Sequence, residues 1–187
     1  MTEKEKALAG MEFRRGDPQL KDRRDRAEKL CFQLNALAPD ETEKRRQILE
    51  ELIPDAKKGG YHIKSPFICE YGDYVSFGRN FFVNCGCKLM DGGPISFGDD
   101  VLVGPDCTFV TVQHPTDPQK RRNGWQIFKP IRVGNNVWFG ARVTVCPGVT
   151  IGDDCVIAAG SVVVRDIPAG WVAAGCPCRP IHRVDGC

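Results

Sequence analysis

The chain has 187 residues, enough for one domain with a substantial hydrophobic core. Its formal net charge of +2 is too small for the strongly basic face that nucleic-acid binding usually needs. No apolar run is long enough to span a bilayer, and the opening MTEKEKALAG lacks the apolar core of a secretory signal. We therefore expect a soluble, cytoplasmic protein with no nucleic-acid or membrane partner.

The first sixty residues are rich in charge and poor in glycine, a composition that favours solvent-exposed helices. Three helix starts are predicted there. Thr2 and Glu5 form a capping box, and Asp17 stands as an N-cap before a proline. Asp40 and Glu43 form the third start. Apolar residues follow at helical spacing: Leu20, Ala27, Leu30, Leu34, Leu37, Ile48, Leu49, Leu52 and Ile53.

Gly59 and Gly60 are expected to end this part, because glycine is a common helix stop. Residues 1–60 are predicted as a helical N-terminal cap and residues 61–187 as a second domain with a different, six-residue period. Apolar residues mark that period, each with a small or apolar residue four places later: Val133, Phe139, Val145, Ile151, Ile157 and Val163. The same frame occurs earlier, from Phe77, Val83, Phe97, Val103 and Phe109.

A period of six is neither helical nor simply alternating, and it predicts a solenoid of short parallel strands with the apolar residues inside. A β-sandwich with regular turns is the alternative that the strict phasing disfavours. Residues 114–130, HPTDPQKRRNGWQIFKP, interrupt the repeat and are predicted as a loop. The basic run at 120–122 is too short to favour a phosphate or nucleic-acid site.

The ten cysteines come without an export signal, so we expect reduced, mostly buried thiols. Cys85 with Cys87, and Cys176 with Cys178, are C-x-C pairs whose side chains would share one face of a strand. A shared metal is conceivable there, but no second pair stands at zinc-finger spacing with histidines. We expect no metal site.

The hexads resemble those of the hexapeptide-repeat acyltransferases. The long segment PIRVGNNVWFGARVTVCPGVTIGDDCVIAAGSVVVRDIPAGWVAAGCPCRPI, with AGMEF, CEYGDYVSFGRNFFVNCGC and QHPTDP, is similar to the galactoside and maltose O-acetyltransferase branch. The resemblance implies a mainly β fold, a left-handed parallel β-helix of triangular section with a small helical cap. It also implies transfer of an acetyl group from acetyl-CoA to a hydroxyl of a galactoside, glucose or maltose. The enzyme would be a homotrimer with active sites between subunits.

A sugar hydroxyl needs a general base to attack a thioester, and histidine titrates near neutral pH. Of His62, His114 and His182, only His114 ends a hexad and opens the interruption. The resemblance assigns the catalytic base to His114 and transition-state stabilisation to Asn84. It places the acceptor sugar on Asp17, Glu70, Asn84 and Asp91. Asp17 as a helix cap and Asp91 as a turn residue are open alternatives.

For coenzyme A, the resemblance implies backbone contacts to the pantetheine arm from Ala141, Ala159 and Val164. Cations for the phosphates would come from Arg165, Arg179 and Arg183, although each could be an ordinary surface charge. Ala141 stands where galactoside enzymes carry a serine, so a hydroxyl contact to the developing oxyanion is lost while a backbone N–H remains.

Three other functions stay open. Acetylation of a hydroxylated antibiotic or another non-sugar alcohol would use the same fold, because acceptor choice depends on a few side chains. A zinc-dependent β-helical carbonic anhydrase would need three histidines around the metal. A non-catalytic scaffold would use the long faces of the solenoid for binding.

Overall fold

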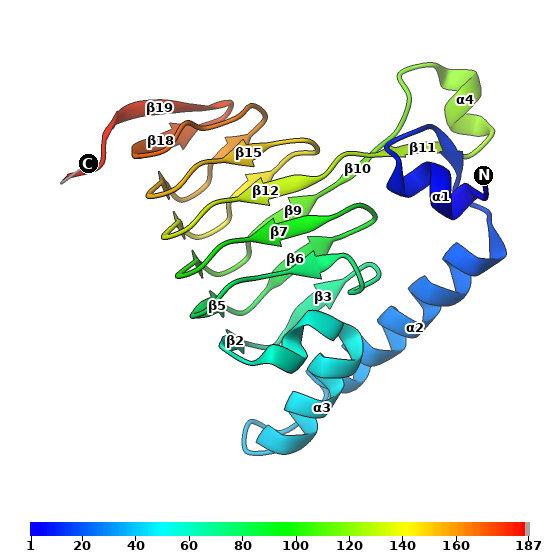
Figure 1. The fold of residues 1–187 in the computed structure, drawn as a ribbon, viewed down its shortest axis with the longest axis horizontal. Helices are drawn as coiled ribbons and strands as arrows, with labels where there is room; N and C mark the ends of the chain where they lie inside the picture. Colours follow the sequence, from blue (N-terminus) through cyan, green and yellow to red (C-terminus); the bar gives the residue numbers. More distant parts are fainter. Residues whose placement is uncertain (186–187) are drawn as a thin grey trace.

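Short strands stacked in parallel form a solenoid with helices at one end, and the structure, a computed structural model, describes residues 1–185 (Figure 1). Each coil gives one strand to each of three sheets, which are the faces of a triangular prism. The first face holds β2 (Tyr61–Ile63), β5 (Phe81–Val83), β8 (Leu102–Val103), β13 (Trp138–Phe139), β16 (Val156–Ile157), β18 (Trp171–Gly175) and β19 (Cys178–Arg183).

The second and third faces follow the first along each coil. The second face holds β3 (Phe67–Cys69), β6 (Cys87–Met90), β9 (Thr108–Val110), β14 (Thr144–Val145) and β17 (Val162–Val163). The third face holds β4 (Val75–Ser76), β7 (Ile95–Phe97), β12 (Ile131–Val133) and β15 (Thr150–Ile151). All neighbouring strands within these faces are parallel except β18 and β19, which form a hairpin.

The inward positions of the hexads form the core, as the period of six predicts. The six predicted positions from Val133 to Val163 are at most 5% exposed. In the earlier coils the inward side chains are aromatic, and the rings of Phe97, Phe109 and Phe139 follow one another with centroids 5.1 and 5.2 Å apart. Burying each such ring is worth about 1.5–3 kcal/mol, so the column of side chains holds the coils together.

The polar residues of the hexads build the turns between the third and first faces. Asn80, Asp100, Asn136 and Asp154 have positive φ angles of 52 to 59°, which asparagine and aspartate tolerate better than most residues. Their side chains bond between coils, and the Asn136 amide donates to Asp154 at 2.7 Å. The hexad glycine is required by close packing, since a Cβ on Gly98 would lie 2.7 Å from the backbone of the next coil.

The N-terminal part forms α1 (Glu3–Leu8), α2 (Pro18–Asn35), α3 (Thr42–Leu52) and the 3-10 helix η1 (Pro54–Lys58). The capping box of Thr2 and Glu5 is confirmed, as is the N-cap Asp17, whose carboxylate accepts the N–H of Leu20 at 3.2 Å. The predicted cap at Asp40 is wrong. The N-cap of α3 is Glu41, whose carboxylate instead accepts the N–H of Ala38 at 3.0 Å in the preceding turn.

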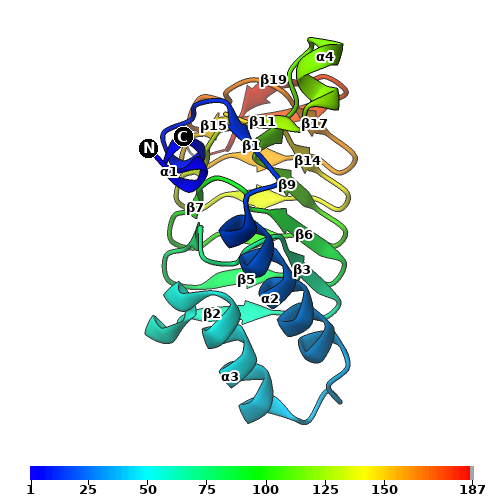
Figure 2. The same ribbon diagram turned by 90° about the vertical axis from the view of Figure 1, so that its right-hand side faces the viewer.

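Helices α2 and α3 close the lower end of the solenoid (Figure 2). Leu34, Leu49 and Leu52 are buried in the same hydrophobic cluster as the first coils, because an open β-helix end would leave apolar side chains in water. The last helical turn ends at Gly59, with φ 74°, as predicted. The division into two domains at residue 60 stays a prediction.

The interruption is more ordered than the predicted loop. Partners in the first face are 18 residues apart in late coils (Trp138 with Val156) but 36 apart across the interruption (Leu102 with Trp138). The inserted residues leave the solenoid as β10 (Val112–Gln113), form α4 (Pro118–Arg122) and return as β11 (Trp125–Phe128). With β1 (Phe13–Arg14) the two strands form a three-stranded antiparallel sheet, which ties the interruption to the N-terminal part.

Candidate functional site

One corner of the prism, between the first and second faces, brings three of the predicted site residues into line. Asn84 follows β5, and its N–H donates to Val103 of the next coil at 2.9 Å. Two coils further along the same corner, the carbonyl of Ala141 accepts the N–H of Gly160, which adjoins Ala159, at 2.8 Å. We call the turns that carry Asn84, Ala141 and Ala159 the first corner.

A cavity of about 490 Å³ opens at the first corner, and both Asn84 and Ala141 line it. The indole of Trp138, 54% exposed, and the side chains of Phe82 and Leu102 form its apolar side. The backbone stays accessible because the corner residues are small. Such a groove suits a long, thin chain that hydrogen-bonds to backbone groups.

The predicted cationic residues lie near the opposite end of the solenoid from α3 (Figure 1). Val164 and Arg165 follow β17, while Arg179 and Arg183 belong to β19. All three arginines are exposed, and none forms an ion pair within residues 1–185. The Arg183 guanidinium lies 4.6 Å from the centroid of the Trp171 ring, which holds it in place. Three uncompensated charges can meet phosphate groups there.

His114 lies outside the solenoid, just after β10. Its ring is exposed, and one ring nitrogen is 3.5 Å from the amide nitrogen of Gln126 on the paired strand β11. Gln126 is itself paired with Phe13 of β1. The hairpin therefore fixes the backbone at His114 while the imidazole stays open. Gln126 was not predicted as a site residue; the alternating segment WQIF is the signal for the strand that carries it.

Asp17 lies beside the same antiparallel sheet. Besides capping α2, it lines a cavity of about 500 Å³ with Arg15, Arg122 and Gly124, among others. The carbonyl of Gly124 accepts the N–H of Arg15 at 3.1 Å, so the segment between β1 and α2 meets the interruption at this point. The structure thus places Asp17 and His114 on one extension of the solenoid, away from Asn84.

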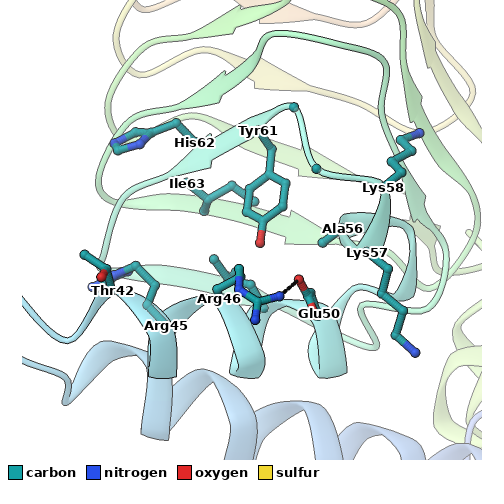
Figure 3. A pocket seen from close by; sticks show the side chains of 13 residues that line it. Thr42, Arg45, Arg46, Glu50, Ala56, Lys57, Lys58, Tyr61, His62 and Ile63 are labelled. Carbon is teal, nitrogen blue, oxygen red and sulfur yellow. Dashed lines mark hydrogen bonds and ion pairs between the residues drawn. The ribbon is translucent and has the colours of Figure 1, made fainter.

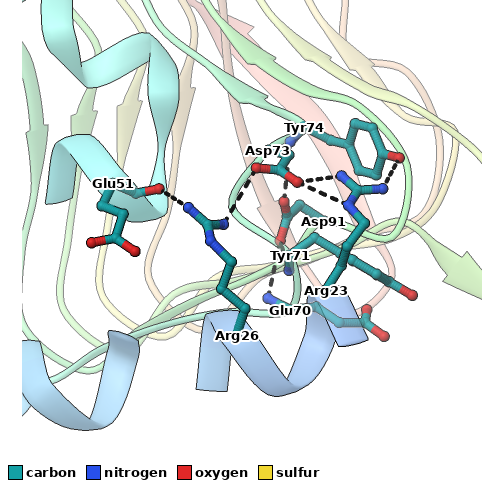
Figure 4. A network of polar contacts seen from close by, with 8 residues as sticks. All are labelled: Arg23, Arg26, Glu51, Glu70, Tyr71, Asp73, Tyr74 and Asp91. Carbon is teal, nitrogen blue, oxygen red and sulfur yellow. Dashed lines mark hydrogen bonds and ion pairs between the residues drawn. The ribbon is translucent and has the colours of Figure 1, made fainter. Parts of the chain in front are cut away.

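Asp91 is fully buried, and its carboxylate organises a turn (Figure 4). It accepts the backbone N–H groups of Glu70, Tyr71 and Tyr74 at 3.0, 2.9 and 3.4 Å. Burial raises the pKa of Asp91 to about 6, although these hydrogen bonds act in the opposite direction. With 0% exposure, the Asp91 carboxylate offers no surface to an acceptor, so the alternative of a turn residue fits this structure better than a sugar contact.

Glu70 stands next to Asp91, but one of its carboxylate oxygens, Oε2, is buried without a hydrogen-bond partner among the described residues. Burial first, and the neighbouring Asp91 second, raise the pKa of Glu70 to about 7. The side chain lines a cavity of about 440 Å³ together with Arg24, Phe32 and Ile68, among others. Glu70 therefore has an unused hydrogen-bonding group at a cavity wall.

We expect Glu70→Gln to make folding less sensitive to pH. A carboxyl whose pKa rises from 4.5 to about 7 on folding stabilises the native state at low pH, and this contribution disappears as pH rises through 7. Glutamine imitates the protonated form, so the variant should gain about 1–2 kcal/mol relative to the wild type between pH 5 and pH 8, a discounted figure because Glu70 is only half-buried. Urea unfolding at both pH values measures it. Glu28→Gln, the same substitution at an exposed carboxylate of the same cavity, is the control, and an equal gain in that variant would contradict the assignment to Glu70.

The structure does not assemble a histidine or cysteine metal centre in residues 1–185. His62 lies in β2 and His182 in β19, at opposite ends of the first face. The expectation that each C-x-C pair shares one face is wrong, because Cys85 is exposed in a turn while Cys87 is buried at the start of β6, and Cys176 and Cys178 differ in the same way. Most of the described cysteines are buried free thiols, as predicted.

None of the described helices combines the length and apolar composition needed to cross a membrane.

Comparison with known proteins identifies the family of the chain. The maltose acetyltransferase hexapeptide capping motif matches residues 6–57, and the hexapeptide repeat of succinyl-transferase matches residues 130–165. The galactoside O-acetyltransferase of Escherichia coli (strain K12) is 39% identical over 166 residues, covering 89% of this chain and 81% of that protein.

Two solved structures superpose over 99% of the chain. The maltose O-acetyltransferase from Clostridium difficile 630 has a TM-score of 0.95 at 40% identity, with 98% of that chain covered. A galactoside acetyltransferase in complex with coenzyme A has a TM-score of 0.91 at 36% identity, with 92% covered. The left-handed β-helix fold class is thereby confirmed, and the chain belongs to the galactoside and maltose O-acetyltransferase family of hexapeptide-repeat proteins.

Proposed function

We propose that the protein transfers the acetyl group of acetyl-CoA directly to a hydroxyl of a sugar of the galactoside, glucose or maltose type. The observation that carries the proposal is the first corner, where Asn84 and Ala141 share one accessible groove. The pantetheine arm would run along Ala141, Ala159 and Val164. Arg165, Arg179 and Arg183, at the end of the solenoid, would meet the coenzyme phosphates.

In the proposed reaction a ring nitrogen of His114 takes the proton of the acceptor hydroxyl as its oxygen bonds to the thioester carbonyl carbon. The carbonyl oxygen gains negative charge, which the Asn84 amide and the backbone N–H of Ala141 can stabilise by donating hydrogen bonds. The carbon–sulfur bond then breaks. Coenzyme A leaves as a thiolate and takes the proton from the imidazolium, so the sugar ester and free thiol form and His114 returns to its starting state.

For the acceptor we propose Glu70, Asn84 and Asp17, while Asp91 supports them by holding the turn that carries Glu70. The Glu70 carboxyl, with its unused oxygen, can bond a sugar hydroxyl as donor or acceptor depending on pH. This assignment favours acceptors with several hydroxyls in fixed directions.

Within one chain, Asn84 lies at the first corner, whereas His114 lies outside the solenoid, beyond the far end of the second face. The strands of the second face between them are up to four residues long, so they span about 10–13 Å at 3.3 Å per residue. That separation is too large for both to act on one ester bond. We therefore propose a homotrimer in which His114 of one chain meets Asn84 of the next.

The outward residues of the first face support this assembly. From β5 to β18 they are apolar and paired from coil to coil: Phe82, Leu102, Trp138, Val156 and Val172, with His62 and His182 in the same register at the two ends. The outward residues of the third face are polar: Ser76, Ser96, Arg132 and Thr150. An apolar stripe on a single face marks a protein interface.

Replacing Trp138 with glutamate should dissociate the trimer, because the charge would be buried in an apolar contact. The mass measured by light scattering should fall from three chains to one, and circular dichroism should stay unchanged since Trp138 lies outside the core. Arg132→Glu, on the polar third face, is the matched control and should stay trimeric. A Trp138→Glu protein that stays trimeric would place the interface elsewhere.

An acceptor panel tests the proposed chemistry. The wild-type protein is incubated with acetyl-CoA and, in turn, galactosides, glucose, maltose and hydroxylated antibiotics, and free thiol release is followed with mass spectrometry of the product. We expect acetylated sugar. Turnover confined to an antibiotic would reject the acceptor class, and the absence of thiol release with every acceptor would reject acetyl transfer.

We also propose a cytoplasmic location, where the free thiols stay reduced.

A further inference from the structure

A second cavity lies at the lower end of the solenoid, away from the candidate active site. It measures about 520 Å³, is open to solvent, and is lined by residues of α3, η1 and β2 (Figure 3). It shares no lining residue with the cavity at the first corner, and it lies at the opposite end of the prism from β19. Nothing in the proposed acetyl transfer uses it.

The floor of this end cavity is apolar, and its centre is aromatic. Leu49, Ala56 and Ile63 are buried beneath it. The ring of Tyr61 projects from β2 with its hydroxyl directed toward α3. The Tyr61 hydroxyl has no hydrogen-bond partner within the described residues, and burial raises its pKa above the ordinary value. The cavity thus offers a ring face and one free polar group.

The rim of the cavity carries four cations, and two of them are neutralised. The Arg46 guanidinium is held at 2.6 Å by both Glu43 and Glu50. Lys58 pairs with Asp55 at 2.7 Å. The three ion pairs join residues three or four positions apart, and the two carboxylates on Arg46 leave one negative charge in excess.

The other two cations are not compensated. The Arg45 guanidinium donates only to the neutral Ser65 hydroxyl, at 2.9 Å, and Lys57 forms no ion pair in the part of the chain that the structure describes. Figure 3 shows Arg45 and Lys57 on either side of Tyr61. Positive charge is therefore left at both ends of an apolar, aromatic trough.

We propose that the end cavity binds a small organic anion with a planar ring. The ring would lie against Tyr61 and the apolar floor, where aromatic contacts are favourable. The anionic group would meet Arg45 or Lys57, whose charges have no carboxylate to compete with. A volume of about 520 Å³ lies within the range of small-molecule sites.

Fluorescent probes test the proposal on the purified wild-type protein. Anilinonaphthalene sulfonate carries a planar ring system and one negative charge, and N-phenylnaphthylamine carries the same rings without the charge. We expect saturable binding of the sulfonate, weakened by salt, and clearly weaker binding of the neutral probe. A crystal soaked with the sulfonate should show it between Tyr61 and α3.

Charge-reversal variants locate the site. Lys57→Glu should lower the affinity for the sulfonate about tenfold, while Lys29→Glu, the same change on the outer side of α2, should leave it within about twofold. Because Lys57 is exposed, its replacement should not disturb folding; Arg45→Gln is a second variant with the same expected direction. Equal affinities for both probes, equal effects of the Lys57 and Lys29 variants, or no saturable binding would each overturn the proposal. Acetyl transfer is measured separately, so its loss does not decide this test.

Discussion

Replacing His114 with alanine is expected to lower kcat for acetyl transfer by about 10³-fold or more, because removing the general base leaves the sugar hydroxyl without a proton acceptor. The KM for acetyl-CoA should change little, since the coenzyme contacts proposed for the first corner do not involve His114. Stopped or coupled thiol-release assays, in which the concentrations of acetyl-CoA and of the sugar are varied, measure kcat and the KM for acetyl-CoA separately.

Two histidine variants serve as controls for His114→Ala, and the assembly state and unfolding of the His114→Ala protein are compared with those of the wild type. His62→Ala and His182→Ala remove an imidazole from β2 and β19 and should keep kcat within about threefold. The His114→Ala protein should keep the assembly state and the unfolding behaviour of the wild type, because the ring is exposed and, within residues 1–185, its side-chain polar contact is the amide of Gln126 at 3.5 Å. If kcat survives the loss of His114, the base has been assigned to the wrong residue.

The second large effect is expected at Asn84. Asn84→Asp should lower kcat by about 10²–10³-fold, because the carboxylate cannot donate a hydrogen bond to the developing oxyanion and repels its charge. The substitution preserves the turn, since the side-chain oxygen can still accept the N–H of Cys85, which it does at 2.9 Å. Kinetics at saturating acetyl-CoA measure the loss.

Gln33→Glu is the control for Asn84, the same change from an amide to a carboxylate at an exposed position of α2 that no part of the proposed reaction uses. Its kcat should be close to that of the wild type. An Asn84→Asp enzyme with nearly normal kcat but a raised KM for the sugar would show that Asn84 binds the acceptor without stabilising the transition state.

Much of the fold could be predicted because the same arrangement of apolar and small residues recurs in every hexad. Each hexad needs an inward apolar residue and a small residue where coils approach, and Phe139, Val145 and Ile151 meet that requirement without exception. The helix starts at Thr2 and Asp17 were found from capping chemistry alone. The N-cap predicted for the third helix was wrong. Asp40 and Glu41 are both acidic, and the conformation of the preceding turn places Glu41 at the N-cap.

The interruption was harder to predict because its partner is distant in sequence. β11 pairs with Phe13 and Arg14, more than a hundred residues earlier, and no local pattern announces that pairing. The sequence does contain a signal for α4. Asp117 before Pro118 repeats the N-cap and proline seen at Asp17, and α4 begins at Pro118.

The roles of the candidate site residues could not all be predicted from their positions in the family motif. The resemblance gives Glu70 and Asp91 one role, but the structure separates them: Asp91 is consumed by three backbone N–H groups, whereas Glu70 keeps an oxygen free. The burial of the Asp91 carboxylate depends on the conformation of the turn after β3, and the six-residue pattern does not predict that conformation.

The central claim is that His114 and Asn84 act on one acetyl group from two different chains. The most direct measurement mixes His114→Ala and Asn84→Asp chains, each nearly inactive as a homotrimer, by co-expression or joint refolding. If every site takes its histidine and its asparagine from neighbouring chains, random assembly restores both residues to about a quarter of the sites, and activity should return to about that fraction of wild type. Activity that stays at the level of the separate variants, in mixed trimers verified by mass spectrometry, would contradict the shared site.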